Sequence, residues 1–240
     1  MKKLFTLAII GMLATASYAQ KGLSLGANYM PLSSSIINQN TWGNGHEYDY
    51  ALTFNSSLGF DVGYNFTENI GIYSGFWSTN LGQNYTDSYD GSSWERNLKF
   101  KYNIIPVMAK YYGAKKRFSF LGGFGVLIAS MKQADQEWLK DGTAFHEDVT
   151  NPITESEFDL GATDVTERYN KTDVMLNLEV GTKVKIIEKL YVDAAFNFGF
   201  GLIDINHADY QIPNNAGVYD ASHNAFTGIR VGVSYVVFGK

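Results

Sequence analysis

The feature that most constrains this chain is an alternation of apolar residues with small or polar ones. Between Leu190 and Leu202, every second residue is Leu, Val, Ala or Phe, and the residues between them are Tyr, Asp, Ala, Asn and Gly. A period of two is that of a β-strand, whose side chains point alternately to its two faces. The alternation recurs in eight segments: 22–29, 51–66, 70–83, 97–112, 117–131, 173–187, 190–202 and 224–238. The sequence therefore predicts an all-β protein.

The connections between these segments alternate in length. Residues 67–69, 113–116 and 188–189 are long enough only for tight turns, whereas 30–50, 84–96, 132–172 and 204–223 are long. An even number of strands with short turns at one end and long loops at the other is typical of an outer-membrane β-barrel. Asn44-Gly45, Asp90-Gly91 and Asp141-Gly142 favour two-residue hairpin turns, so we expect some strand pairs to project beyond the barrel.

Alternation alone fits both a membrane barrel with its apolar face toward lipid and a soluble barrel with that face inside. The second face separates these alternatives, because in a soluble barrel it would meet water and carry long charged residues. In segment 51–66 this face instead carries Thr, Asn, Ser, Gly, Asp, Gly and Asn. Small residues suit the crowded lumen of an eight-stranded barrel, which leaves no open channel. We therefore predict an eight-stranded antiparallel transmembrane β-barrel, an up-and-down meander, in the bacterial outer membrane.

The N-terminus has the pattern of a secretory signal peptide. Lys2 and Lys3 precede a 13-residue apolar run, and Ser17-Tyr18-Ala19 supplies small residues for cleavage before Gln20. We expect residues 1–19 to be removed and residues 20–240 to form the barrel domain. The chain has no cysteine, and its net charge of −5 argues against a nucleic-acid partner.

Two motifs carry a resemblance to a known family. The run Asn103 to Tyr112, N-I-I-P-V-M-A-K-Y-Y, together with the strand plan, resembles the PorT-like outer-membrane β-barrel family of Bacteroidetes. The segment from Arg230 to Val237 is similar to the terminal signal read by the outer-membrane assembly machinery. The resemblance implies either a surface-exposed barrel without a defined role or an accessory of a secretion or gliding apparatus. Pro106 lacks an N–H, so we expect it at a bulge or an unpaired position.

Charged residues on the predicted inner face are candidates for a salt-bridge network that fills the lumen. In segment 97–112 we place Leu98, Phe100, Tyr102 and Ile104 toward lipid, and Lys99 and Lys101 toward the lumen. The full candidate set is Asp61, Lys99, Lys101, Glu179, Lys183, Lys185, Asp193 and Arg230. Buried charges require partners, so we favour a structural network over a gate or an ion path.

The loops offer few residues with recognisable chemistry. Segment 132–171 holds ten acidic and four basic residues, a net charge of −6, but no EF-hand spacing, and we favour a solvated loop over a cation site. His46, His146, His207 and His223 fall in long loops without a nucleophile elbow or a His-Glu-x-x-His motif. We therefore predict no catalytic, cofactor or metal site.

The expected function is a structural or surface-interaction role. The partners would be outer-membrane lipid, the assembly machinery during biogenesis, and a protein bound through the extracellular loops. A PorT-like accessory component and a small lipid-modifying enzyme are the alternatives. We also expect Tyr29, Tyr64, Trp77, Tyr112 and Tyr235 to anchor the membrane interfaces.

Overall fold

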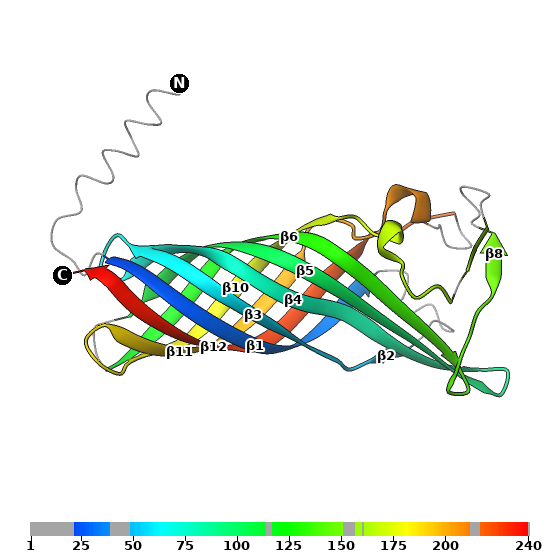
Figure 1. Cartoon of the computed structure of the whole chain (residues 1–240), viewed down its shortest axis with the longest axis horizontal. Coiled ribbons are helices and arrows are strands. Elements are labelled where there is room, and N and C mark those ends of the chain that lie inside the picture. The colour runs from blue at the N-terminus through cyan, green and yellow to red at the C-terminus, as the bar shows by residue number, and fades with distance from the viewer. Residues whose placement is uncertain are drawn as a thin grey trace, which may run out of the picture.

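The computed structural model describes residues 22–38, 49–113, 117–150, 157–159, 161–211 and 217–239. Eight long strands form one closed antiparallel barrel, in which each strand pairs with the next and the last pairs with the first (Figure 1). They are β1 (Gly22–Asn38), β3 (Thr53–Asn65), β4 (Ile70–Tyr89), β5 (Ser92–Tyr112), β6 (Phe118–Lys140), β10 (Thr172–Lys185), β11 (Leu190–Gly201) and β12 (Ser222–Gly239). The predicted all-β, eight-stranded meander is confirmed. The signal peptide lies outside the described residues and stays a prediction.

Closure of the barrel is staggered. The register can be followed from Gly22 through the paired residue on each strand, once round the ring. It returns to β1 at Leu32, so the stagger of the barrel is ten residues. A stagger of this kind tilts the strands by roughly 40° to the barrel axis. Because the ring is closed, its strands have no free edge, and their backbone groups can be paired within hydrocarbon.

Tight turns close one end of the barrel, where β1 begins and β12 ends (Figure 1). Residues 66–69 join β3 to β4, and residues 186–189 join β10 to β11, as predicted. In the first turn the Thr67 hydroxyl accepts hydrogen bonds from the backbone N–H groups of Asn69 and Ile70. By the usual arrangement of such barrels, this end faces the periplasm and the opposite end faces outward.

At the opposite end several strands project well past the barrel, and we call this part the extension. The β4–β5 hairpin turns at Asp90-Gly91, and β6 turns at Asp141-Gly142 into β7 (Thr143–Ala144). Both residues of each turn have positive φ, between 50° and 76°, which is the geometry of a type I′ turn. The protruding hairpins are thus confirmed at these two sites, whereas Asn44-Gly45 lies outside the described residues. Segment 84–96 and the first part of 132–172, predicted as loops, are largely strand.

Short elements complete the outer end. They are β2 (Asp49–Ala51), which pairs with β4, the two-stranded sheet of β8 (Asp148–Thr150) and β9 (Glu157–Asp159), and two 3-10 turns, η2 (Thr166–Arg168) and η3 (Ala208–Tyr210). In the described part of the chain, no helix has the length and apolar character of a membrane span.

The apolar side chains of the barrel point outward. Phe196 and Phe198 on β11 are 54% and 40% exposed, whereas Asn197 between them is fully buried in the lumen. The same holds around the ring for Leu25, Leu58, Phe60, Ile72, Val107, Phe120, Phe124, Ile128, Leu178, Val180, Ile229 and Val231. A continuous outward belt of large apolar residues requires lipid around it, so the predicted direction of the apolar face is confirmed for this belt.

Above the belt the two faces exchange character. Leu98, Phe100, Tyr102 and Ile104 of β5 are at most 3% exposed and point inward, so our placement of these residues toward lipid was wrong. The physical reason is that this part of β5 lies in the extension, where the outer face meets water and the apolar face must turn inside.

An adjacent pair of apolar residues marks the exchange on strand after strand, because one member belongs to the outer belt and the next to the inner core. The pairs are Tyr29-Met30 on β1, Phe76-Trp77 on β4, Ile104-Ile105 on β5, Leu127-Ile128 on β6 and Val174-Met175 on β10. On β5 the pair is followed by Pro106, which has no partner in the β4 register, where pairing jumps from Val107 to Ile104. The expected unpaired position of this proline is confirmed on the β4 side, whereas on the β6 side Pro106 stands opposite Leu127.

Candidate functional site

A cluster of charged residues fills the lumen toward the periplasmic end. Arg230 of β12 lies at its centre, 3% exposed, and its guanidinium donates to Glu179 of β10. The same guanidinium forms ion pairs with Asp193 and, at 3.7 Å, with Asp61. Lys110 of β5 completes the cluster with its Nζ 3.0 Å from Glu179 Oε2. Three acids from β3, β10 and β11 therefore face two bases from β5 and β12 across the lumen, in a place that water scarcely reaches.

Neutral side chains hydrogen-bond to this cluster or pack against it. Asp61 accepts hydrogen bonds from Trp77 Nε1 at 2.8 Å and from Asn28 Nδ2 at 3.0 Å. A third base, Lys183, lies over the rings of Tyr112 and Tyr191, 4.5 and 4.6 Å from their centroids. A cavity of about 20 Å³ remains among these residues, on the scale of a single water.

The structure brings together five of the residues that the sequence placed in the lumen network. Asp61, Glu179, Asp193 and Arg230 are in contact, and Lys183 lines the same cavity. Lys99 and Lys101 were wrongly placed, because both lie on the outer face of β5, where Lys101 Nζ is 3.2 Å from Asp135 Oδ2. Lys185 has no ion pair with a described member of the cluster.

Sequence reasoning missed Lys110 because it followed one alternation through the whole of β5. The Ile104-Ile105 pair shifts the apolar phase by one residue, and Lys110 is inward in the new phase. The same shift applies to two predicted interface anchors. Trp77 and Tyr112 are 1% and 9% exposed within the lumen, whereas Tyr29 and Tyr235 are about half exposed on the outer surface.

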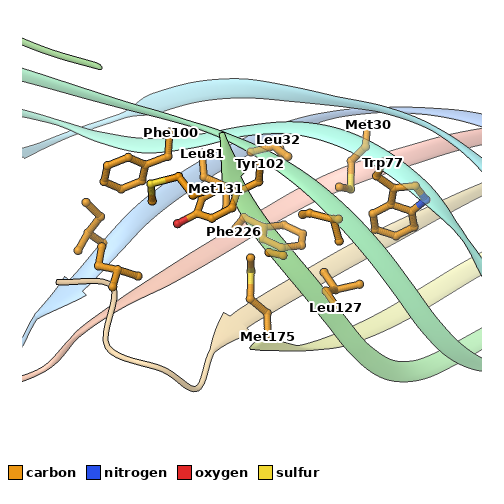
Figure 2. Close-up of a cluster of buried hydrophobic side chains, with 14 of the residues drawn as sticks. Met30, Leu32, Trp77, Leu81, Phe100, Tyr102, Leu127, Met131, Met175 and Phe226 are labelled. Atoms are coloured by element: carbon orange, nitrogen blue, oxygen red, sulfur yellow. The ribbon is translucent and has the colours of Figure 1, made fainter. Parts of the chain in front are cut away.

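A layer of apolar side chains fills the lumen beyond the charged cluster. Figure 2 shows these side chains gathered between the strands: Met30, Leu32, Leu81, Phe100, Tyr102, Leu127, Met131, Met175 and Phe226. The loops add Val165, Tyr169 and Ile205, all buried, and Tyr169 contacts Phe100 edge to face at 4.7 Å. The charged cluster and the apolar layer together leave the described lumen packed, as eight strands require.

Aromatic rings and cationic side chains pack against one another in the extension. The Arg96 guanidinium lies 5.3 Å from the ring of Trp138 and 5.9 Å from the ring of Tyr85, and its Nε donates to Gln136. Nearer the tip, Lys140 lies over Trp94, which packs edge to face on Phe145 at 4.8 Å. Burial raises the pKa of Tyr85 well above its ordinary value, so its hydroxyl stays neutral. The extension is therefore a folded part of the molecule.

Hydrogen bonds order the loops above the apolar layer. Asp204 accepts from the Tyr219 hydroxyl at 2.7 Å, from Gln211 Nε2 at 2.9 Å and from the Ser222 backbone N–H at 3.0 Å. Arg168 Nη2 donates to the carbonyl of Asp159, and His146 Nδ1 lies 2.9 Å from Asp159 Oδ2. This contact holds the pKa of the Asp159 carboxyl below its ordinary value.

The candidate ligating residues are scattered. His207 contacts Asp209, the ring of His223 stacks on Phe200, and His46 lies outside the described residues. Over the described ranges no three acidic or histidine side chains are grouped as a metal site would need. Of the acids of segment 132–171 that the structure describes, Asp135 and Glu137 lie on β6, Asp148 on β8, Glu157 and Asp159 on β9, and Glu167 in η2, and the others lie between these elements.

A closed eight-stranded barrel with an outward apolar belt and a packed lumen defines an outer-membrane β-barrel protein. A family model described as an outer membrane protein beta-barrel domain matches residues 13–205, and the chain belongs to this family. Its location is the bacterial outer membrane. No relative among curated proteins matches the chain.

Solved structures with a similar fold share little sequence with this chain. Neisserial surface protein A is 10% identical, with a TM-score of 0.48, over 90% of this chain and 97% of that one. The attachment invasion locus protein Ail of Yersinia pestis is 11% identical, with a TM-score of 0.41, over 90% and 99%. The outer membrane protein OprG of Pseudomonas aeruginosa is 12% identical, with a TM-score of 0.43, over 90% and 96%.

Proposed function

We propose that this protein is a non-enzymatic barrel that presents its extension to another protein at the cell surface. The observation that carries the proposal is strand length. A membrane-spanning β-strand needs about 9–11 residues, whereas β4, β5 and β6 have 20, 21 and 23. Roughly half of each strand therefore serves something other than crossing the membrane.

The composition of the extension supports a contact surface. Tyr89 at the β4–β5 tip is 69% exposed, and Tyr50 on β2 is 39% exposed. Tyr, Trp and Arg are the residues that most often dominate binding energy at protein interfaces. Here they stand on paired strands, so little conformational entropy would be lost when a partner binds.

The test is site-specific photo-cross-linking in intact cells. A photoreactive residue at Tyr89 should give one discrete protein adduct, and the same residue at Phe196, which faces lipid, should give none. Deleting residues 86–89 and 92–95 moves the Asp90-Gly91 turn down to the Tyr85–Arg96 pair and preserves the facing of every remaining side chain. This shortened hairpin should abolish adducts from a second photoreactive residue at Tyr50. Absence of any adduct from Tyr89 would contradict the proposal.

A PorT-like accessory role is the second candidate, favoured by the Ile104-Ile105-Pro106 motif, whose proline has no partner on β4. The two candidates predict different cross-linked proteins. For a PorT-like accessory, the protein captured at Tyr89 would be a component of a multi-protein secretion or gliding assembly. Our proposal that the protein is not an enzyme is tested separately. Mass spectrometry of lipid A and phospholipids from a deletion strain should match the parent strain, and a missing modification would overturn it.

A further inference from the structure

Three exposed lysines lie on neighbouring strands just above the apolar belt. Lys99 lies on β5, Lys132 on β6, and Lys171 immediately before β10, and all three are exposed. These strands are neighbours, since β6 pairs with both β5 and β10. The backbone N–H of Met131, next to Lys132, donates to the carbonyl of Lys171 at 2.8 Å. We call Lys99, Lys132 and Lys171 the lysine arc.

The height of the arc above the belt can be judged from the strands themselves. The last outward apolar residues on these strands are Ile105, Ile128 and Val174, which lie three to six residues below the corresponding lysines. A strand tilted by roughly 40° rises about 2.5 Å per residue along the barrel axis. The arc therefore lies about 7–15 Å above the hydrocarbon, in the headgroup region, within reach of a long side chain.

The arc occupies one side of the barrel. At comparable positions elsewhere, the outward residues are Ser33 and Ser35 on β1, Ser78 and Asn80 on β4, and Ala225 and Thr227 on β12, none of them charged. Neighbouring outward residues on the arc side, Asn103, Ser130 and Thr172, offer hydrogen-bonding groups on three adjacent strands. The cations are thus concentrated on a protein whose net charge is −5.

The arc is also available for binding. Within the described ranges, none of Lys99, Lys132 and Lys171 forms an ion pair. Asp135 lies opposite Lys99 in the β5–β6 register, but its carboxylate is paired with Lys101. Asp164 forms a β-bridge with Asp135, and its carboxylate already accepts hydrogen bonds from Thr166. Exposed ammonium groups without an ion-pair partner at this level attract anionic headgroups from their surroundings.

We propose that the lysine arc binds the phosphate groups of the glycolipid in the outer leaflet. This leaflet carries phosphorylated lipid A, whose phosphates lie directly above the acyl chains. Lysine binds phosphate as a point charge, and basic residues beside an anionic leaflet attract its headgroups. The apolar residues below each lysine would contact the acyl chains of the same molecule, so one lipid would be held by both of its parts.

The experiment compares two triple variants with the same change in charge. The first, K99Q/K132Q/K171Q, removes the arc. The second, R117Q/K140Q/K189Q, removes three exposed cations at the periplasmic turns and at the hairpin tip. Both are purified in detergent, shown to be folded by the heat-dependent shift in gel mobility, and titrated with phosphorylated lipid A, with bound lipid counted by native mass spectrometry.

The first variant should bind lipid A at least about tenfold more weakly than the unmodified protein, and the second should bind within about twofold of it. Lipid A stripped of its phosphates should bind the unmodified protein as weakly as intact lipid A binds the first variant. Equal binding by the two triple variants would overturn the proposal. Displacement of lipid A by millimolar inorganic phosphate would also overturn it, because the site would then recognise a free anion.

Discussion

The lower and upper halves of β5 share one backbone and the same inward and outward faces, yet they carry opposite chemistry. Below Ile105 the outward residues are apolar and the inward ones include Lys110, whereas above it the outward residues include Lys99 and the inward ones are Leu98, Phe100 and Tyr102. The difference follows from the solvent, since lipid surrounds one half and water the other. The protein is a membrane barrel continued upward by a part that is built like a soluble protein.

This comparison predicts that substitutions of the same kind change the free energy of unfolding by different amounts in the two halves. The largest effect is expected for Arg230, which is buried among Glu179, Asp193 and Asp61. Arg230→Ala should lower the free energy of unfolding by about 3–5 kcal/mol, because it leaves acids buried without a base. Arg96→Ala in the extension should cost only about 1 kcal/mol. Heat-dependent gel mobility measures both, and unchanged unfolding of Arg230→Ala would refute the network.

Phenylalanines from the two halves give the next contrast. Phe100 is fully buried in the extension, and Phe100→Ala should cost about 3 kcal/mol and expose the loops near Tyr169 to protease. Phe120 is 55% exposed toward lipid, and Phe120→Ala should cost less than half as much, since no protein cavity forms there. Limited proteolysis and unfolding of both variants check this order. Equal losses would mean that the two halves are packed alike.

Charge placed on the outer face should distinguish lipid from water. Phe124 lies near the middle of the apolar belt on β6, and Phe124→Lys should cost about 2–3 kcal/mol. Lys99→Phe, on the outer face of the extension, should change stability by less than about 0.5 kcal/mol. Unfolding in lipid vesicles is the measurement, and a tolerated lysine at position 124 would place the belt elsewhere.

The smallest expected effect is a dependence of the loops on pH. The hydrogen bond to His146 holds the pKa of the Asp159 carboxyl below its ordinary 3.8, so the folded loop favours the ionised carboxylate. Its contribution is present above pH 3.8 and is lost as the pH falls through the lower folded value. Pepsin cleavage near residue 146 should therefore rise as the pH falls below 3.8. Asp159→Asn should remove this dependence, and an unaltered profile would assign it to another group.

The class of fold was predictable because period-two alternation and alternating connection lengths are local properties of the sequence. The membrane boundary was not recognised, although the adjacent apolar pairs such as Phe76-Trp77 and Ile104-Ile105 mark it. For that reason Lys99 and Lys101 were assigned to the lumen, and Lys110 was missed. The partners of Arg230 could not be read from the sequence either, because Glu179 and Asp61 reach it across the lumen from other strands.

The most direct test of the exchange between faces is an accessibility scan along β5. The chain has no cysteine, so single cysteines at positions 97–111 can carry a spin label without background. Outward labels at 105, 107, 109 and 111 should be accessible to oxygen from the lipid phase, and outward labels at 97, 99, 101 and 103 to a water-soluble nickel chelate. Inward labels should be protected from both. Labels at Lys99 and Lys101 that are protected from both reagents would place these residues in the lumen and contradict the account.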